Sequence, residues 1–178
     1  MNKRFTKLIA ALALLVGLTI PLGMWGQTSS TVTIQYTGNT TTNMTGNNDA
    51  TLVGLSSTDW SVVGAKGASQ NFPGLNKAGE IRLYYDENGS NTITVTNLQN
   101  NTISSIVITY TGVNYSNGKV LVNDNEVEAS DGSYAINATS FVVTNGNTSN
   151  IQVRISSIVV TYTGGNTPQP DTYTITYK

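Results

Sequence analysis

The sequence predicts an all-β protein, a β-sandwich or jelly roll of roughly eight to ten strands preceded by a signal-peptide helix. Two observations predict this fold class. After Gln27 the apolar residues do not recur at the three- and four-residue spacing of an amphipathic helix. The chain instead carries short alternating runs of Thr, Val, Ile and Tyr. These runs are separated by glycine and asparagine, which favour turns.

Strands are predicted where the alternating runs occur, and turns where Asn-Gly or Asp-Gly pairs interrupt them. The predicted strands are Thr31–Thr37, Thr51–Gly54, Asp59–Val63, Glu80–Tyr85, Thr92–Asn97, Ser104–Thr111, Lys119–Val122, Ser140–Thr144 and Ile151–Thr163. The turn signals are Asn88-Gly89, Asn117-Gly118, Asp131-Gly132 and Asn145-Gly146. Many short strands divided by turns in this way are typical of a sandwich or barrel.

An internal repeat supports the same architecture. Ile103–Gly112 and Ile155–Gly164 are identical at nine of ten positions, and Val32–Gly38 is a looser copy. The separations between the copies are unequal, whereas a solenoid or propeller needs a fixed period. We therefore expect the copies to be equivalent strands of one sandwich.

The close copies also predict a local irregularity. In the first copy, Ile106, Ile108 and Tyr110 alternate on one face, whereas Ile103 has the opposite parity. A β-bulge at the intervening Ser-Ser pair would return Ile103 to the core face. Val107 makes the other face partly apolar, which indicates an interior strand. The second copy repeats this pattern at the equivalent positions.

The first 26 residues have the layout of a cleavable signal peptide. Three basic residues precede the apolar run Leu8–Ile20, and Pro21 and Gly23 interrupt the helix before a predicted cleavage between Gly26 and Gln27. A membrane-spanning helix needs about 20 apolar residues, which this run does not reach. The alternative is an uncleaved anchor, because further apolar residues come after Pro21. We expect a secreted or cell-surface protein.

Composition excludes several function classes. The part after Gly26 holds six basic and ten acidic residues, a net charge of −4, and its cations are scattered singly, which argues against nucleic acid as a partner. The chain has no cysteine and no histidine, which excludes lipidation at a cysteine, His-based triads, thiol nucleophiles and ordinary zinc sites. Most carboxylates lie in turns; only Asp59 and Glu80 border predicted strands. We expect a protein that is not an enzyme.

A family resemblance accompanies the strand pattern. The Trp-containing segment Asp59–Gly67, the run Ile81–Tyr85 and the final strand Ile151–Tyr162 carry it. Over about Val32 to Thr163 the chain resembles a β-sandwich module of secreted Bacteroidetes proteins, similar in outline to the jelly rolls of carbohydrate-binding modules. The resemblance implies a fold and a surface location, and it carries no set of functional residues.

Residues 27–164 are assigned to this sandwich and residues 165–171 to a Gly/Pro linker. Residues 172–178 start another alternating strand, which cannot form a domain alone. This segment resembles the opening of a Listeria–Bacteroides repeat, the internalin-type B-repeat, and we interpret it as the first strand of a truncated following repeat. The alternative is that it pairs back onto the sandwich or frays.

Aromatic residues are the candidate ligand contacts, because sugars stack on flat rings beside amides and carboxylates. Along Glu80–Tyr85, alternation places Ile81, Leu83 and Tyr85 on the core side, and Arg82 and Tyr84 together on the outer face. Tyr115 and Tyr134 lie in or beside polar turns and are further candidates, whereas Trp60 and Tyr110 are expected in the core.

We therefore expect a binding module for a glycan or another extracellular macromolecule; the alternative is a structural spacer in an adhesin-like stalk. A concave patch with two or more exposed aromatics would favour binding.

One acidic loop is a candidate calcium site. Asp86, Asn88 and Asn91 offer oxygen ligands at close spacing, and Gly89 permits a sharp turn. The alternative is a hairpin tip, where Asp, Asn and Gly are favoured for backbone reasons alone. A second candidate calcium loop is Asn123–Glu126 with Asp131, and the same alternative applies to it. No other metal or cofactor is expected.

Overall fold

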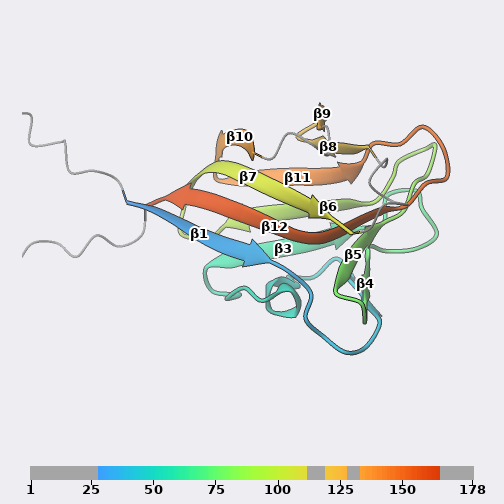
Figure 1. Ribbon diagram of the computed structural model, residues 1–178, viewed down its shortest axis with the longest axis horizontal. Coiled ribbons are helices and arrows are strands. Elements are labelled where there is room, and N and C mark those ends of the chain that lie inside the picture. The colour runs from blue at the N-terminus through green and yellow to red at the C-terminus, as the bar shows by residue number, and fades with distance from the viewer. Residues whose placement is uncertain (1–27, 112–118, 128–132, 165–178) are drawn as a thin grey trace, which may run out of the picture.

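The computed structural model describes residues 28–111, 119–127 and 133–164. They form two antiparallel sheets packed face to face, with the apolar core between them (Figure 1). The predicted all-β sandwich is confirmed. The predicted signal peptide, linker and tail strand, and Tyr115, lie outside the described residues. Within the described ranges, no helix has the length and apolar character required to cross a membrane.

The first sheet has seven strands and the second has five. The first contains, in spatial order, β10 (Ser133–Ala138), β7 (Thr102–Tyr110), β12 (Val153–Thr163), β5 (Glu80–Leu83), β4 (Gly74–Asn76) and β2 (Thr42–Asn43), with β1 (Ser29–Ile34) also paired to β12. The second contains β3 (Trp60–Ala65), β6 (Thr92–Asn97), β11 (Ser140–Asn145), β8 (Val120–Val122) and β9 (Asn125–Val127). The long strand β12 pairs with β5 near its start and with β1 near its end.

The predicted strand Thr51–Gly54 is wrong. Ala50–Val53 is a short 3-10 helix, η1, and Gly54 ends it in the left-handed conformation at φ 83°. Two apolar residues before a glycine fit a helical turn that buries Val53 as well as they fit a strand. The strands β2, β4, β9 and β10 were not predicted, because each is short or lacks a clean alternation of apolar residues.

The repeat forms a locally symmetric pair of interior strands. The strands β7 and β12 are antiparallel neighbours, and Val107 pairs with its own equivalent, Val159, at the centre of the register. The register shifts at Ser104 and at Ser156, as the predicted bulges require. The Oγ of Ser104 donates to the carbonyl of Thr161 (3.1 Å), and the Oγ of Ser156 donates to that of Thr109 (3.0 Å). Ile103 and Ile155 are buried, so the bulge prediction is confirmed.

Aromatic side chains from both sheets join the core. Trp60 of β3 is buried and meets Tyr162 of β12 edge to face, with ring centroids 5.2 Å apart and an interplanar angle of 81°. The prediction that Trp60 lies in the core is confirmed. Tyr110 is half-buried against the same core, and burial raises the pKa of its phenol.

Asparagine side chains satisfy backbone groups where the strands end. Asn145, at the end of β11, donates to the carbonyls of Leu83 (2.9 Å) and Ile151 (2.8 Å). Along the outer edge of β3, Asn48 donates to the carbonyl of Trp60 and accepts from the N–H of Val62, both at 3.0 Å. These side-chain amides replace the backbone partners that a further strand would supply.

Candidate functional site

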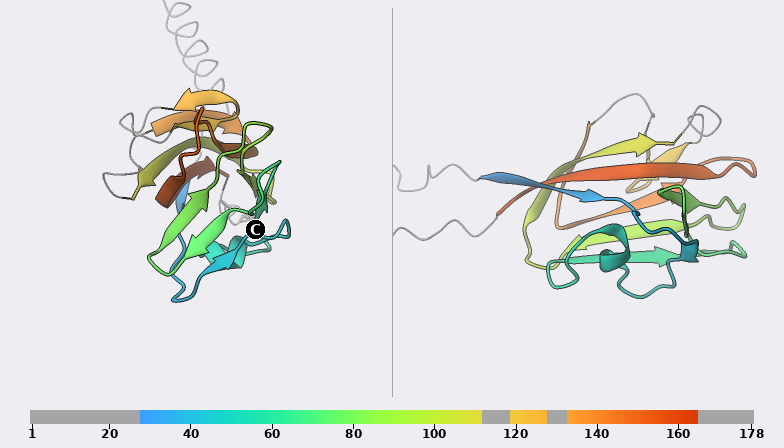
Figure 2. Two further views of the ribbon diagram at one scale, coloured as in Figure 1. Left: turned by 90° about the vertical axis from the view of Figure 1, so that its right-hand side faces the viewer. Right: turned by 60° about the horizontal axis from the view of Figure 1, so that its bottom comes forward.

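The two ends of the sandwich differ in whether the chain enters and leaves the domain there. Ser29 pairs with Thr163, so the described chain enters and leaves the domain at one end (Figure 2). We call this the proximal end. The loops after β3, β5 and β11 lie at the opposite, distal end. Each end carries a hollow, and the two hollows differ in chemistry.

The distal hollow has a volume of about 460 Å³. Its walls combine two half-buried tyrosines with carboxylates and amides from three loops. The lining residues are Ser69, Gln70, Asn71, Tyr84, Tyr85, Asp86, Glu87 and Asn150. Rings beside several hydrogen-bonding side chains are the surface that sugar recognition needs.

Asn91 holds the distal loops together. Its side chain is buried, its Oδ1 accepts the N–H of Tyr84 (3.0 Å), and its Nδ2 donates to the carbonyls of Lys66 (3.0 Å) and Asn71 (2.9 Å). The backbone carbonyl of Asn91 also accepts the N–H of Asn145 (3.3 Å). One asparagine thus fixes two loops of the hollow to each other and to β11.

Tyr84 lines the distal hollow, and Tyr85 lines it too. The expectation that Tyr85 faces the core with Ile81 and Leu83 is wrong, because β5 ends at Leu83 and strand alternation does not continue past that residue. Gly74 on the neighbouring strand leaves room for Tyr84, since a Cβ at that position would lie 3.2 Å from the Tyr84 Oη. Sequence periodicity alone does not reveal where a strand stops.

Arg82 on β5 lies near Gly74, as Tyr84 does, but is not among the residues that line the distal hollow. Its Cβ lies beside Gly74, and its Nε lies 3.5 Å from Oε2 of the buried Glu80. Arg154 on β12 also reaches this carboxylate, at 3.2 Å. Glu80 therefore lies between two cations, and its ion pair with Arg154 links β5 to β12.

The other predicted site residues lie elsewhere. Tyr134 on β10 pairs in register with Ile106 and packs against the core, far along the sheet from β5.

In the candidate calcium loop, Oδ1 of Asp86 accepts the N–H of Asn88 (2.9 Å), which is a turn-stabilising bond, and Asn91 points inward to its backbone partners. An oxygen of Asp86 and the side-chain oxygen of Asn91 thus each already accept a backbone N–H group. Among the residues placed by the structure, no group of three or more His, Cys, Asp or Glu could hold a metal ion.

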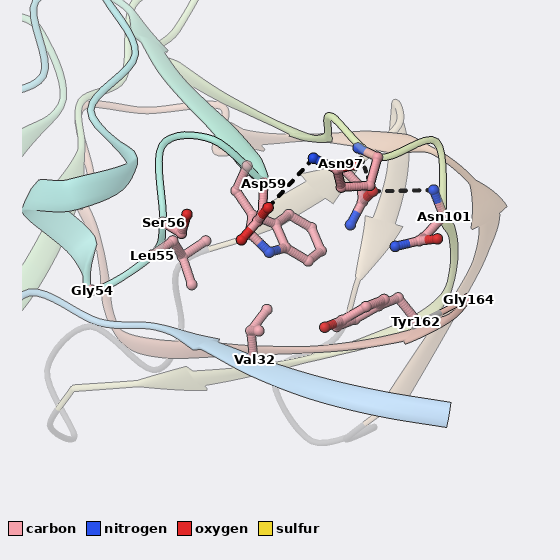
Figure 3. A pocket seen from close by; sticks show the side chains of 11 residues that line it. Val32, Gly54, Leu55, Ser56, Asp59, Asn97, Asn101, Tyr162 and Gly164 are labelled. Carbon is pink, nitrogen blue, oxygen red and sulfur yellow. Dashed lines mark hydrogen bonds between the residues drawn. The ribbon is translucent and has the colours of Figure 1, made fainter. Parts of the chain in front are cut away.

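The proximal hollow is larger, about 510 Å³, and opens between the two sheets (Figure 3). Figure 3 shows Asp59 on one side of the space, Val32 and Tyr162 on the other, and Leu55 at one end. The lining residues are Val32, Gly54, Leu55, Ser56, Asp59, Trp60, Asn97, Gln99, Asn101, Tyr162 and Gly164. Sequence reasoning missed this site because Trp60 and Tyr162 lie far apart in the chain and on different sheets.

The proximal rim is held by the turn 98–101, which the buried side chain of Asn97 anchors. Oδ1 of Asn97 accepts the N–H groups of Gln99 (3.0 Å) and Asn101 (3.1 Å). The N–H of Leu98 donates to the carbonyl of Asp59 (2.8 Å), which joins this turn to the start of β3. Nε2 of Gln99 lies 3.4 Å from Oδ1 of Asp59. The Asp59 carboxylate is thus held at the rim of the hollow.

No protein-family model matches the chain, and no curated protein or solved structure is similar to it.

Proposed function

We propose that the protein is a non-catalytic, extracellular binding module that holds a glycan in the distal hollow. The observation that carries the proposal is the meeting of Tyr84 and Tyr85 with Asp86, Glu87 and several amides in one hollow. The resemblance to sandwich modules of secreted Bacteroidetes proteins supports the same role. The signal-peptide layout of the first 26 residues supports export to the cell surface or medium.

Recognition would depend on two kinds of contact. A tyrosine ring gives a pyranose a flat apolar face, and the side chains of Asp86 and Asn71 offer hydrogen bonds to its hydroxyls. Asn91 fixes the loops in advance, so little conformational entropy is lost when the ligand is bound. A shallow site of this kind should have a dissociation constant of about 10 μM to 1 mM.

The chain path favours binding over the spacer alternative. A spacer adds length to a stalk when the chain enters at one end of each domain and leaves at the other. Here β1 begins beside the end of β12, so the domain adds little length between its N-terminal and C-terminal connections. The distal hollow points away from both of these connections, which suits a tip that meets a ligand.

A glycan array combined with substitution tests the proposal. Tyr84→Ala or Tyr85→Ala should weaken binding of any glycan hit by about 1–2 kcal/mol, which is roughly 5–30-fold. Leu98→Ala is the matched control, because Leu98 is an exposed apolar residue at the proximal end. Urea unfolding of each variant separates lost contacts from lost stability. An array without hits, or binding that survives both tyrosine substitutions, would contradict the proposal.

A further inference from the structure

We infer that the proximal hollow is a second binding site and that it takes a cationic group carried on an alkyl arm, such as the ammonium of a polyamine or of a lysine side chain. This inference does not depend on the glycan proposal, because it concerns the other end of the sandwich. Three features of the hollow carry it: its charge, its apolar wall and the fixed position of its carboxylate.

The carboxylate of Asp59 favours a positively charged ligand. Asp59 is acidic, and none of the residues found to line the hollow is Lys or Arg. Among the residues that the structure describes, the partners of its Oδ1 are neutral donors, Gln99 Nε2 at 3.4 Å and Thr58 Oγ1 at 3.5 Å. Within the described part of the chain, the negative charge therefore has no cation beside it in the hollow. A cation in the hollow gains Coulomb attraction to it, whereas an anion is repelled.

The aromatic and aliphatic side chains of the wall favour a ligand whose charged group is carried on an alkyl arm. The rings of Trp60 and Tyr162 and the aliphatic side chains of Val32 and Leu55 border the same space as Asp59. Aromatic rings attract cations, and aliphatic groups pack against methylenes. An ammonium on an alkyl arm matches both parts of the wall at once. A neutral polyol of the same size can hydrogen-bond to the carboxylate but gains no charge–charge attraction to it.

The site is preorganised. Both sheets contribute to the lining of the hollow. Trp60 and Asn97 belong to one sheet, and Val32 and Tyr162 belong to the other. The edge-to-face contact between Trp60 and Tyr162 fixes the floor. The rim hydrogen bonds of Asn97 fix the carboxylate side. A ligand thus meets a formed site, and binding does not require either sheet to move.

The test uses the full chain and monitors the indole N–H signal of Trp60 by NMR during titration. Spermidine and N-acetyl-lysine amide are the cationic probes, 1-butanol is the neutral comparator and butyrate the anionic one. We expect both cations to shift the Trp60 signal and to bind about tenfold more tightly than 1-butanol, with no response to butyrate. Tighter binding of the lysine derivative would identify a protein side chain as the natural ligand; tighter binding of spermidine would identify a free polyamine.

Asp59→Asn is the decisive variant, because asparagine keeps an acceptor for Gln99 but loses the charge. It should weaken cation binding about tenfold, whereas Asp86→Asn at the distal end should leave it unchanged. Salt gives a second measurement on the unaltered protein: cation binding should weaken with added NaCl, and butanol binding should not. The inference is overturned if neither cation moves the Trp60 signal at about 10 mM, if 1-butanol binds as tightly, or if a folded Asp59→Asn variant binds cations unchanged.

Discussion

Replacing Asn91 by alanine should destabilise the protein by about 3 kcal/mol, because it removes three side-chain hydrogen bonds worth roughly 1 kcal/mol each. The side chain is fully buried, so water cannot easily replace the lost partners of Tyr84, Lys66 and Asn71. Asn91→Asp should be at least as damaging near neutral pH. A carboxylate has no hydrogen for the two carbonyls, and its charge would be buried.

Equilibrium unfolding in urea measures both effects. Asn88→Ala is the matched control, since Asn88 is exposed on the same loop, and its loss should change the free energy of unfolding by less than about 0.5 kcal/mol. The destabilisation of Asn91→Asp should shrink as acid protonates the new carboxyl group. A loss below about 1 kcal/mol for Asn91→Ala would refute the view that this residue joins the distal loops.

Three further predictions concern stability. Ile106→Ala and Ile158→Ala should each cost about 2–5 kcal/mol in urea unfolding, because both side chains are fully buried in paired strands; losses below about 0.5 kcal/mol would contradict that placement. Ser104→Ala and Ser156→Ala should cost similar amounts, about 1 kcal/mol each, and markedly unequal losses would count against the local symmetry. Burial raises the pKa of Asp49 above its ordinary 3.8, so the ionised form opposes folding at neutral pH. Asp49→Asn should therefore stabilise the protein at pH 7, with the gain disappearing as the pH falls below about 3.8; a gain independent of pH would exclude this cause.

The sandwich could be predicted because several strands alternate along most of their length. In β6, threonines face out and Ile93 and Val95 face in, and in β11 the residues Phe141 and Val143 face in on the same period. Even the bulges were predictable, since the buried Ile103 breaks the parity of its strand. The short strands were not, because two or three residues carry no periodicity. In β10, Asn137 at φ 55° interrupts the alternation where the register shifts.

The candidate site was predictable only in part. Extending the alternation of β5 past its last residue, Leu83, placed Tyr84 correctly but failed at Tyr85, two residues beyond the strand. Asparagine in a sequence of this composition indicates turns. A local pattern could not show that Asn91 and Asn145 would be buried and bonded to backbone groups distant in the chain. The proximal hollow depends on two sheets coming together, which no single segment encodes.

The position of Asn48 has a consequence for how the protein behaves at high concentration. The strand β3 is an edge strand, and a bare edge invites pairing with the same strand of another molecule, the first step toward aggregation. Asn48 already occupies the carbonyl of Trp60 and the N–H of Val62, and the N–H of Asp49 occupies the carbonyl of Val62 (2.8 Å). A second chain approaching this edge finds these groups of Trp60 and Val62 already in use. One side chain and the neighbouring backbone N–H thus protect this part of the edge without a charged or proline residue in the strand itself.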